Sequence, residues 1–190
     1  MELLFINSGS VFEATRYTTP CEISRSTISN YLAVLEATSA VYVVRPFSIH
    51  RSTEIVLAPK GYAFDTGFIC YYRGWQDLRQ EDLGSLWEHY VLNEILARTQ
   101  SRDIRYWRDK RGHEIDFVLV RRGKLPMAIE CKWSSTNFAS QNLRAFRRQY
   151  PEGENWVIVQ DVQRTFAKED NSLKIEFLDF AEFVRRLKRL

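Results

Sequence analysis

The most regular alternation of apolar and polar positions lies between residues 114 and 133. Two runs, Glu114–Val120 and Met127–Trp133, flank a polar turn that contains Gly123. Each run is largely apolar on one alternating face and carries charged residues on the other, which is the pattern of a β-strand with one buried face. We therefore predict a β-hairpin whose two strands pair symmetrically about Gly123.

This symmetry brings charged residues on the two strands together. It places Asp116 opposite Glu130, and Glu114 opposite Lys132. Directly opposed side chains have Cβ atoms about 4.5–5.5 Å apart, and like charges there are destabilising. A cation between Asp116 and Glu130 would relieve the repulsion, so the pattern predicts a metal site with a lysine beside it. The alternative is an ordinary solvent-facing side of the hairpin, with an ion pair between Glu114 and Lys132.

The first 83 residues read as helices followed by a small sheet. Helices are predicted over 1–8, 11–22 and Ser24–Glu36, and strands over Val41–Val44, Glu54–Leu57 and Tyr62–Phe64. Helices that precede a small sheet in this way predict an N-terminal winged helix-turn-helix. The polar, acidic stretch 74–84 predicts a linker, so we assign residues 1–83 to a first domain and residues 84–190 to a second.

The helix over Ser24–Glu36 has two possible uses. Its apolar stripe consists of Ile28, Tyr31, Leu32 and Leu35. In a winged helix-turn-helix such a helix can read DNA. Residues 1–83, however, contain seven basic and nine acidic residues, a net charge of −2, whereas residues 84–190 have a net charge of +5. Packing against protein is therefore favoured for this helix, and attraction to nucleic acid is expected in the second half.

The second half predicts an α/β domain (α+β for the whole chain) with a central mixed sheet. The order is helix Ser85–Thr99, strands Arg105–Arg108, Glu114–Val120 and Met127–Trp133, helix Ser140–Tyr150, strand Trp156–Val159, strand Leu173–Phe177 and helix Phe180–Leu190. Ser85 is the expected cap of the first helix. Glu88 and Glu94 fall inside the apolar arc of that helix, where a carboxylate is costly to bury without a partner.

The αβββαβ order, with Asp on the second strand and Glu-x-Lys on the third, resembles the PD-(D/E)XK nuclease-like superfamily. The matching residues are Ile115-Asp116 and Glu130-Cys131-Lys132, with Glu88 on the preceding helix. Ile115 stands where the motif has proline. The resemblance implies that the carboxylates bind a metal ion. The absence of the proline is tolerable, because this chemistry needs the carboxylate and not the proline.

A wider set of motifs resembles the C-terminal region of a family of prokaryotic AAA-type ATP-binding proteins, in which a winged helix precedes a nuclease-like domain of unknown function. The motifs are Tyr31-Leu32-x-x-Leu35, Lys60–Gly67, Leu86-Trp87-Glu88, Gly112–Phe117 and Ile129–Lys132. The chain contains no GxxxxGK[ST] phosphate loop, so the ATPase module is absent here. We expect a fragment, a broken gene or a stand-alone version, and ATP-dependent function is not carried over.

The resemblance assigns roles to the site residues. Asp116 and Glu130, with Glu88 from the helix, would hold Mg²⁺ (or Mn²⁺), and Lys132 would orient or deprotonate the attacking water and stabilise charge on the phosphate. The expected phosphate contacts to DNA are Arg108, Lys110, Arg111, Arg121, Arg122, Lys124, Arg144, Arg147 and Arg148. The alternative for these basic residues is an ordinary solvated surface.

Composition narrows the setting. The three cysteines Cys21, Cys70 and Cys131 are far apart, which predicts no disulfide framework and a cytoplasmic location. The scattered histidines argue against a structural zinc site. No apolar run reaches the length of a membrane span, and the N-terminus does not read as a signal peptide, so no membrane partner is expected.

Two functions therefore remain. The first is a metal-dependent endonuclease or hydrolase that cleaves phosphodiester bonds of DNA, or a catalytically silent DNA-binding version of that fold. The second is a winged-helix regulatory or interaction module that partners a separate AAA-type ATPase.

Overall fold

The computed structural model describes residues 1–48, 58–100 and 103–190, and the chain divides into two compact units, Met1–Arg79 and Gln80–Leu190. This division falls slightly before the boundary expected between residues 83 and 84. The strand predicted over Glu54–Leu57 lies outside the described residues.

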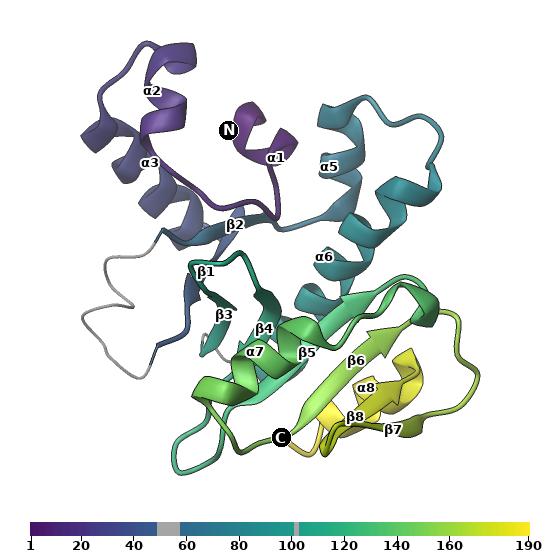
Figure 1. The fold of residues 1–190 in the computed structure, drawn as a ribbon. Coiled ribbons are helices and arrows are strands. Elements are labelled where there is room, and N and C mark those ends of the chain that lie inside the picture. The colour runs from purple at the N-terminus through teal and green to yellow at the C-terminus, as the bar shows by residue number, and fades with distance from the viewer. Residues whose placement is uncertain (49–57, 101–102) are drawn as a thin grey trace. The chain divides into compact units, whose positions relative to one another are not determined.

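Within its described residues, the first unit contains helices and one antiparallel strand pair (Figure 1). Its elements are α1 (Glu2–Ile6), α2 (Thr15–Cys21), α3 (Arg25–Ala37), β1 (Val41–Pro46), β2 (Lys60–Ala63) and α5 (Thr66–Arg73). Ser24 begins α3, because its hydroxyl accepts a hydrogen bond from the Thr27 amide at 3.2 Å. The winged-helix assignment stays a prediction.

One prediction for this unit was wrong in detail, and one helix was missed. The helix predicted over 11–22 begins only at Thr15, because Val11 forms a β-bridge with Lys60. Helix α5 was not predicted. It is delimited by local signals: Asp65 accepts from the Gly67 amide at 2.7 Å, and Gly74 ends the helix with a φ of 66°.

Side-chain hydrogen bonds join the elements of this unit around a small core. The Ser8 hydroxyl accepts from the Ala63 amide at 2.7 Å, which joins the end of α1 to β2. The Arg73 guanidinium at the end of α5 donates to the carbonyls of Ile6 and Ser8 at 2.8 and 3.1 Å. Phe5, Tyr62 and Ile69 are fully buried between these elements.

The second unit is a mixed sheet with helices packed on it (Figure 1). Its elements are α6 (Gln80–Thr99), β3 (Ile104–Arg108), β4 (Glu114–Leu119), β5 (Met127–Lys132), the 3₁₀ turn η1 (Ser135–Asn137), α7 (Gln141–Gln149), β6 (Asn155–Val159), β7 (Phe166–Asp170), β8 (Leu173–Leu178) and α8 (Phe180–Leu187). The PD-(D/E)XK assignment stays a prediction.

The expected start of the first helix in this unit was wrong. Helix α6 begins at Gln80 rather than at Ser85, and the Ser85 carbonyl lies 2.7 Å from the His89 ring nitrogen Nδ1 within the helix. Glu81 and Asp82 lie in the first turn, where acidic side chains interact favourably with the helix dipole. The stretch read as a linker is therefore partly helical.

The sheet strands lie in the order β3-β4-β5-β6-β8-β7. Strands β3, β4 and β5 are antiparallel neighbours, β5, β6 and β8 are parallel, and β7 is antiparallel to β8. Between β4 and β5 the pairs are Phe117 with Ile129 and Leu119 with Met127, which confirms the predicted symmetry about Gly123. Gly123 has a φ of 71°, a conformation that glycine adopts without strain.

Helices cover this sheet with apolar side chains. Figure 1 shows α7 lying across one face of the sheet, where its Phe146 ring meets Trp107 of β3 at a centroid distance of 5.3 Å. Helix α6 packs on β5 and contacts α8, with Tyr90 and Phe180 stacked at 4.9 Å. No helix within the described parts of the chain has both the length and the apolar character needed to cross a membrane.

Candidate functional site

The β4–β5 hairpin holds the two predicted carboxylates next to each other. Continuing the observed register by one pair places Asp116 opposite Glu130. At this point an Asp116 side-chain oxygen enters the strand pairing, because the Cys131 amide donates to Oδ2 at 2.7 Å. Asp116 and Glu130 are only 9% and 1% exposed, so both carboxylates are held away from water.

Lys132 supplies the positive charge between the carboxylates. Its Nζ lies 2.8 Å from Glu130 Oε2 and 3.5 Å from Asp116 Oδ2. The two acids are therefore close enough to share one cation, and here that cation is the ammonium group of Lys132. The predicted partner of Lys132, Glu114, has a carboxylate oxygen 3.8 Å from Nε of Arg108.

Burial and charge together shift the proton affinities of this group. Burial and then the charge of Asp116 raise the pKa of Glu130, Lys132 opposes both effects, and the resulting pKa is about 8. Burial acts to lower the pKa of Lys132, but the carboxylates of Asp116 and Glu130 outweigh it and the pKa of Lys132 is raised. Lys132 is therefore protonated at neutral pH. The carboxyl group of Glu130 loses its proton only near pH 8.

One oxygen of the site lacks a partner. Glu130 Oε1 is buried and makes no hydrogen bond to any residue that the structure describes. A buried polar atom in this state is destabilising, and a hard cation is one way to satisfy it. The donor set is small, because no three His, Cys, Asp or Glu side chains within 1–48, 58–100 and 103–190 are placed to hold a metal together. Two carboxylates still fit Mg²⁺ or Mn²⁺, since Mg²⁺ commonly takes one or two of them with water and substrate phosphates.

A pocket of about 420 Å³ opens above the hairpin. Its lining consists of Gln80, Glu81, Gly84 and Glu88 from α6, Asp116, Cys131 and Lys132 from the strands, and Trp133, Ser134 and Asn137 from the segment after β5. The structure thus brings Glu88 into the same pocket as Asp116 and Lys132. Glu130 is not part of the lining. Its buried carboxylate contacts Lys132, which is.

Asp161, which sequence reasoning missed, holds one wall of this pocket. Its carboxylate accepts from Ser134 Oγ at 2.6 Å and from the Ser135 amide at 2.8 Å. Partial burial acts to raise the pKa of Asp161, but these hydrogen bonds outweigh it and lower the pKa. Parallel pairing of β5 and β6 explains the contact, because the carboxyl ends of parallel neighbours meet at one edge of the sheet. An acidic residue two positions after the end of β6 was the available signal.

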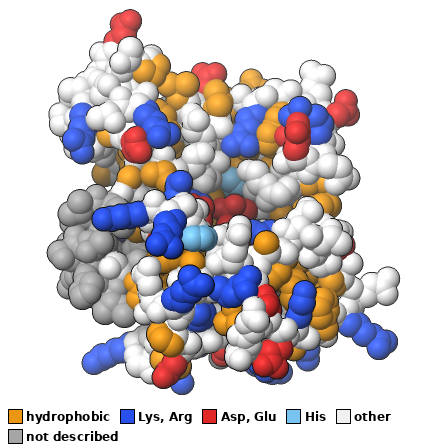
Figure 2. Space-filling view, in the orientation of Figure 1, with side chains coloured by type: hydrophobic (Ala, Val, Ile, Leu, Met, Phe, Trp, Pro, Cys, Tyr) orange, Lys and Arg blue, Asp and Glu red, His pale blue; other side chains and the backbone are white. Residues whose placement is uncertain are grey.

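The basic residues predicted to contact DNA are spread over the second unit, and none of them lines the pocket. Figure 2 shows Lys and Arg side chains in several small groups, with Asp and Glu side chains among them. Arg121 donates to the Leu190 carbonyl at 2.7 Å, and Arg144 lies beside Lys168 in a separate hollow. The exposed members of the set are Arg108, Lys110, Arg111, Arg122, Lys124 and Arg148.

Arg147 is built into the interior instead of facing solvent. It is 7% exposed, and Nε donates to Asn155 Oδ1 at 2.6 Å. Its other nitrogens donate to the carbonyls of Pro126, Tyr150, Glu152 and Glu154. Burial lowers the pKa of Arg147 to about 10. Arg147 therefore holds the turn between α7 and β6. Its guanidinium nitrogens already donate to these groups, so Arg147 does not face solvent as the predicted phosphate contact would require.

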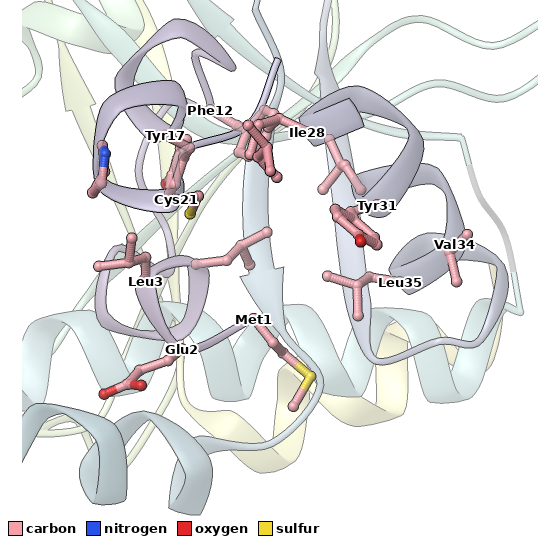
Figure 3. Close-up of a pocket in the computed structure, with 14 residues that line it drawn as sticks. Met1, Glu2, Leu3, Phe12, Tyr17, Cys21, Ile28, Tyr31, Val34 and Leu35 are labelled. Atoms are coloured by element: carbon pink, nitrogen blue, oxygen red, sulfur yellow. The ribbon is translucent and has the colours of Figure 1, made fainter. Parts of the chain in front are cut away.

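The first unit carries a second, apolar hollow of about 740 Å³, shown in Figure 3. Helices α1, α2 and α3 line it, and Glu2 is the charged residue among the lining side chains. The predicted stripe on α3 contributes to this hollow and is only partly buried, with Ile28 7% and Tyr31 60% exposed. The stripe therefore leaves part of its apolar surface exposed in the hollow.

Comparisons with known proteins match both units. Residues 83–179 match a family described as Domain of unknown function (DUF4143), and residues 1–79 match one described as Domain of unknown function (DUF8612). An uncharacterized protein of Mycobacterium tuberculosis is 26% identical over 141 residues, which cover 72% of this chain and 32% of the relative. An uncharacterized protein of Mycobacterium bovis matches with the same values. The chain thus spans about a third of the length of these relatives.

Proposed function

Because this chain belongs to the family described as Domain of unknown function (DUF4143), we propose its function from the site itself: a Mg²⁺-dependent nuclease-like protein that hydrolyses phosphodiester bonds of DNA. The observation that carries the proposal is the pair of buried, neighbouring carboxylates bridged by Lys132, with Glu130 Oε1 unsatisfied. We assign residues 80–190 to a PD-(D/E)XK-like fold and residues 1–79 to a winged helix. The helix, three antiparallel strands, helix and parallel strand in sequence support the first assignment.

The chemistry divides between carboxylates and lysine. Asp116 and Glu130 would be the metal ligands, and Glu88, which lines the same pocket but is not placed as a third direct ligand, would act through a bound water. A bound Mg²⁺ or Mn²⁺ neutralises the phosphate and lowers the pKa of a bound water. Glu130 must lose its proton to act as a ligand, so metal affinity should rise with pH toward about 8.

Lys132 acts as a positive charge in this scheme. Its raised pKa keeps the ammonium protonated, so Nζ can donate to the phosphate or to the attacking water. This favours an orienting and charge-stabilising role over deprotonation of the water. With the charges of Asp116 and Glu130 neutralised by a bound cation, Lys132 would no longer bridge them and its Nζ could turn to the substrate phosphate.

The test is cleavage of labelled single-stranded, nicked and branched DNA with Mg²⁺ or Mn²⁺. We expect cleavage by the unmodified protein and a loss of about 100-fold or more in Asp116→Asn, Glu130→Gln and Lys132→Met. Glu114→Gln is the matched control. Glu114 is a carboxylate of the same hairpin, but it lies beside Arg108 of β3. Cleavage that persists in Asp116→Asn would remove the site. DNA binding without cleavage on any substrate would identify the catalytically silent version.

The apolar hollow of the first unit favours a second function for residues 1–79. We propose that this hollow binds an amphipathic helix of an AAA-type ATPase module. Its lining is almost wholly apolar, as a helix-binding groove requires, and the relatives are about three times as long as the segment they share with this chain.

The hollow can be tested by calorimetric titration of the chain with an ATPase module from a longer family member. Tyr31→Glu and Val34→Glu should weaken binding about tenfold or more, because each places a charge on the apolar lining. Tyr71→Glu is the control, since Tyr71 is 78% exposed and lies outside the hollow. An equal effect of all three substitutions would contradict binding in this hollow.

A further inference from the structure

The pocket above the hairpin has an aromatic wall directly beside Lys132. Trp133 follows Lys132 in sequence and is half-buried in the pocket lining. Its ring meets Trp87 edge to face, at a centroid distance of 5.9 Å and an interplanar angle of 86°. Because Trp133 also lines the pocket, part of its side chain faces the cavity, where a planar group can stack on it.

Trp133 rests on a fixed support. Trp87 is 7% exposed, and its indole nitrogen donates to the Ile158 carbonyl of β6 at 2.9 Å. Ser134, the next residue in sequence, donates to the Asp161 carboxylate at 2.6 Å. The indole ring thus packs on a fixed neighbour, and the backbone that follows it is anchored, so little ordering is needed before a planar group stacks on it.

Polar side chains in the same lining suit the edge of a base. Asn137 of η1 and Gln80 at the start of α6 both line the pocket and are exposed. Side-chain amides offer a donor and an acceptor together, and they pair with base edges through both. The volume of about 420 Å³ lies within the range of about 300–1,000 Å³ typical of small-ligand sites.

We propose that this pocket binds an unstacked base of single-stranded DNA, with the base stacked on Trp133 and its edge hydrogen-bonded by Asn137 or Gln80. The inference rests on the proposed function and names its substrate class as single-stranded DNA. A base inside an intact duplex is stacked on both faces and reaches such a pocket only after it is flipped out. A stacked base next to Lys132 also brings its phosphate toward Asp116 and Lys132, which line the same pocket.

The binding experiment uses the full chain without divalent metal, so that it does not depend on cleavage. The probes are fluorescently labelled oligothymidylate of about 12 nucleotides, an abasic strand of equal length and a duplex of equal length. We expect the unmodified protein to bind oligothymidylate more tightly than the other two. Trp133→Leu should weaken oligothymidylate binding roughly 5- to 100-fold, while binding of the abasic strand stays unchanged.

Two further variants separate stacking from folding. Trp133→Phe keeps an aromatic face and should retain most of the affinity, and thermal unfolding of each variant shows whether it is folded. Phe166→Leu is the matched control, because this aromatic residue is 44% exposed and lies on β7 outside the pocket. Phe166→Leu should bind all three probes like the unmodified protein.

The outcomes distinguish this inference from the proposed function. Equal affinity for oligothymidylate and the abasic strand, or an equal loss for both probes in Trp133→Leu, would overturn base stacking. DNA cleavage that is indifferent to Trp133 would overturn the stacking and leave the hydrolytic site standing. Trp133-dependent binding with no cleavage in Mg²⁺ or Mn²⁺ would support the base site and contradict the hydrolysis.

Discussion

The carboxylate of Glu130 should make the stability of the second unit depend on pH in a way that one substitution removes. Glu130 is 1% exposed, and burial, followed by the charge of Asp116, raises its pKa from 4.5 to about 8. The folded state therefore holds a proton that the unfolded chain releases between these two values. Consequently the contribution of Glu130 to the free energy of unfolding falls as the pH rises from 4.5 to about 8.

The size of the effect follows from the shift. Each pKa unit corresponds to about 1.4 kcal/mol, so the full shift sets an upper bound of about 5 kcal/mol on the change. Glu130→Gln removes the titrating group and keeps an oxygen that can accept from Lys132 Nζ, 2.8 Å away in the unmodified protein. The difference in stability between Glu130→Gln and the unmodified protein should therefore move in favour of the variant by about 2–5 kcal/mol across this range.

The assay is urea unfolding of both proteins, followed by tryptophan fluorescence, at closely spaced pH values. Groups far from the hairpin contribute equally to both curves, so the difference between the two stability curves reports Glu130 and its coupling to Asp116 and Lys132. A difference that is independent of pH, or one that moves in favour of the unmodified protein as the pH rises, would refute the assignment of Glu130 as a buried acid that releases its proton late.

Two further changes test the packing of the second unit and the capping of α3. Arg147→Met should lower the free energy of unfolding by about 3–5 kcal/mol, because it leaves Asn155 and several buried carbonyls without donors. Arg148→Met, at the exposed neighbouring position, is the control. It should change the free energy of unfolding by less than about 0.5 kcal/mol in the same urea titration. Ser24→Ala should lower the free energy of unfolding of the first unit by about 0.5–2 kcal/mol, because the hydrogen bond from the Thr27 amide to the Ser24 hydroxyl is lost. Hydrogen exchange of the amides in the first turn of α3 should become faster in parallel. Unchanged exchange rates there would contradict a capping role for Ser24.

The hairpin could be predicted because its signals are local. Alternating apolar positions identify the two strands, and Gly123 fixes the turn, so the register follows by symmetry. The position of Lys132 Nζ could not be read in this way, because both Glu114 and Glu130 lie within reach of its long side chain. Burial of Glu130 decides the outcome, since the unpaired charge there is the most costly.

The elements that were missed lack such periodicity. Strand β7 is almost entirely exposed, so no alternation identifies it, and it is held mainly by pairing with β8 and by the stacking of Phe166 on Phe177 at 4.7 Å. Arg147 and Arg148 have the same chemistry in adjacent positions, yet only one is buried. Which of the two arginines is buried depends on how α7 packs on the sheet. That packing cannot be inferred from the local sequence, because the two neighbours are the same residue type.

The most direct test of the metal site is Mn²⁺ binding measured by electron paramagnetic resonance near pH 8, where about half of Glu130 is ionised. The account predicts one bound Mn²⁺ per chain in the unmodified protein. Affinity should fall about tenfold or more in Asp116→Asn and in Glu130→Gln, stay unchanged in Glu114→Gln, and rise in Lys132→Met because a competing cation is removed. Equal Mn²⁺ binding in all four variants, or none in the unmodified protein, would contradict a metal site at Asp116 and Glu130.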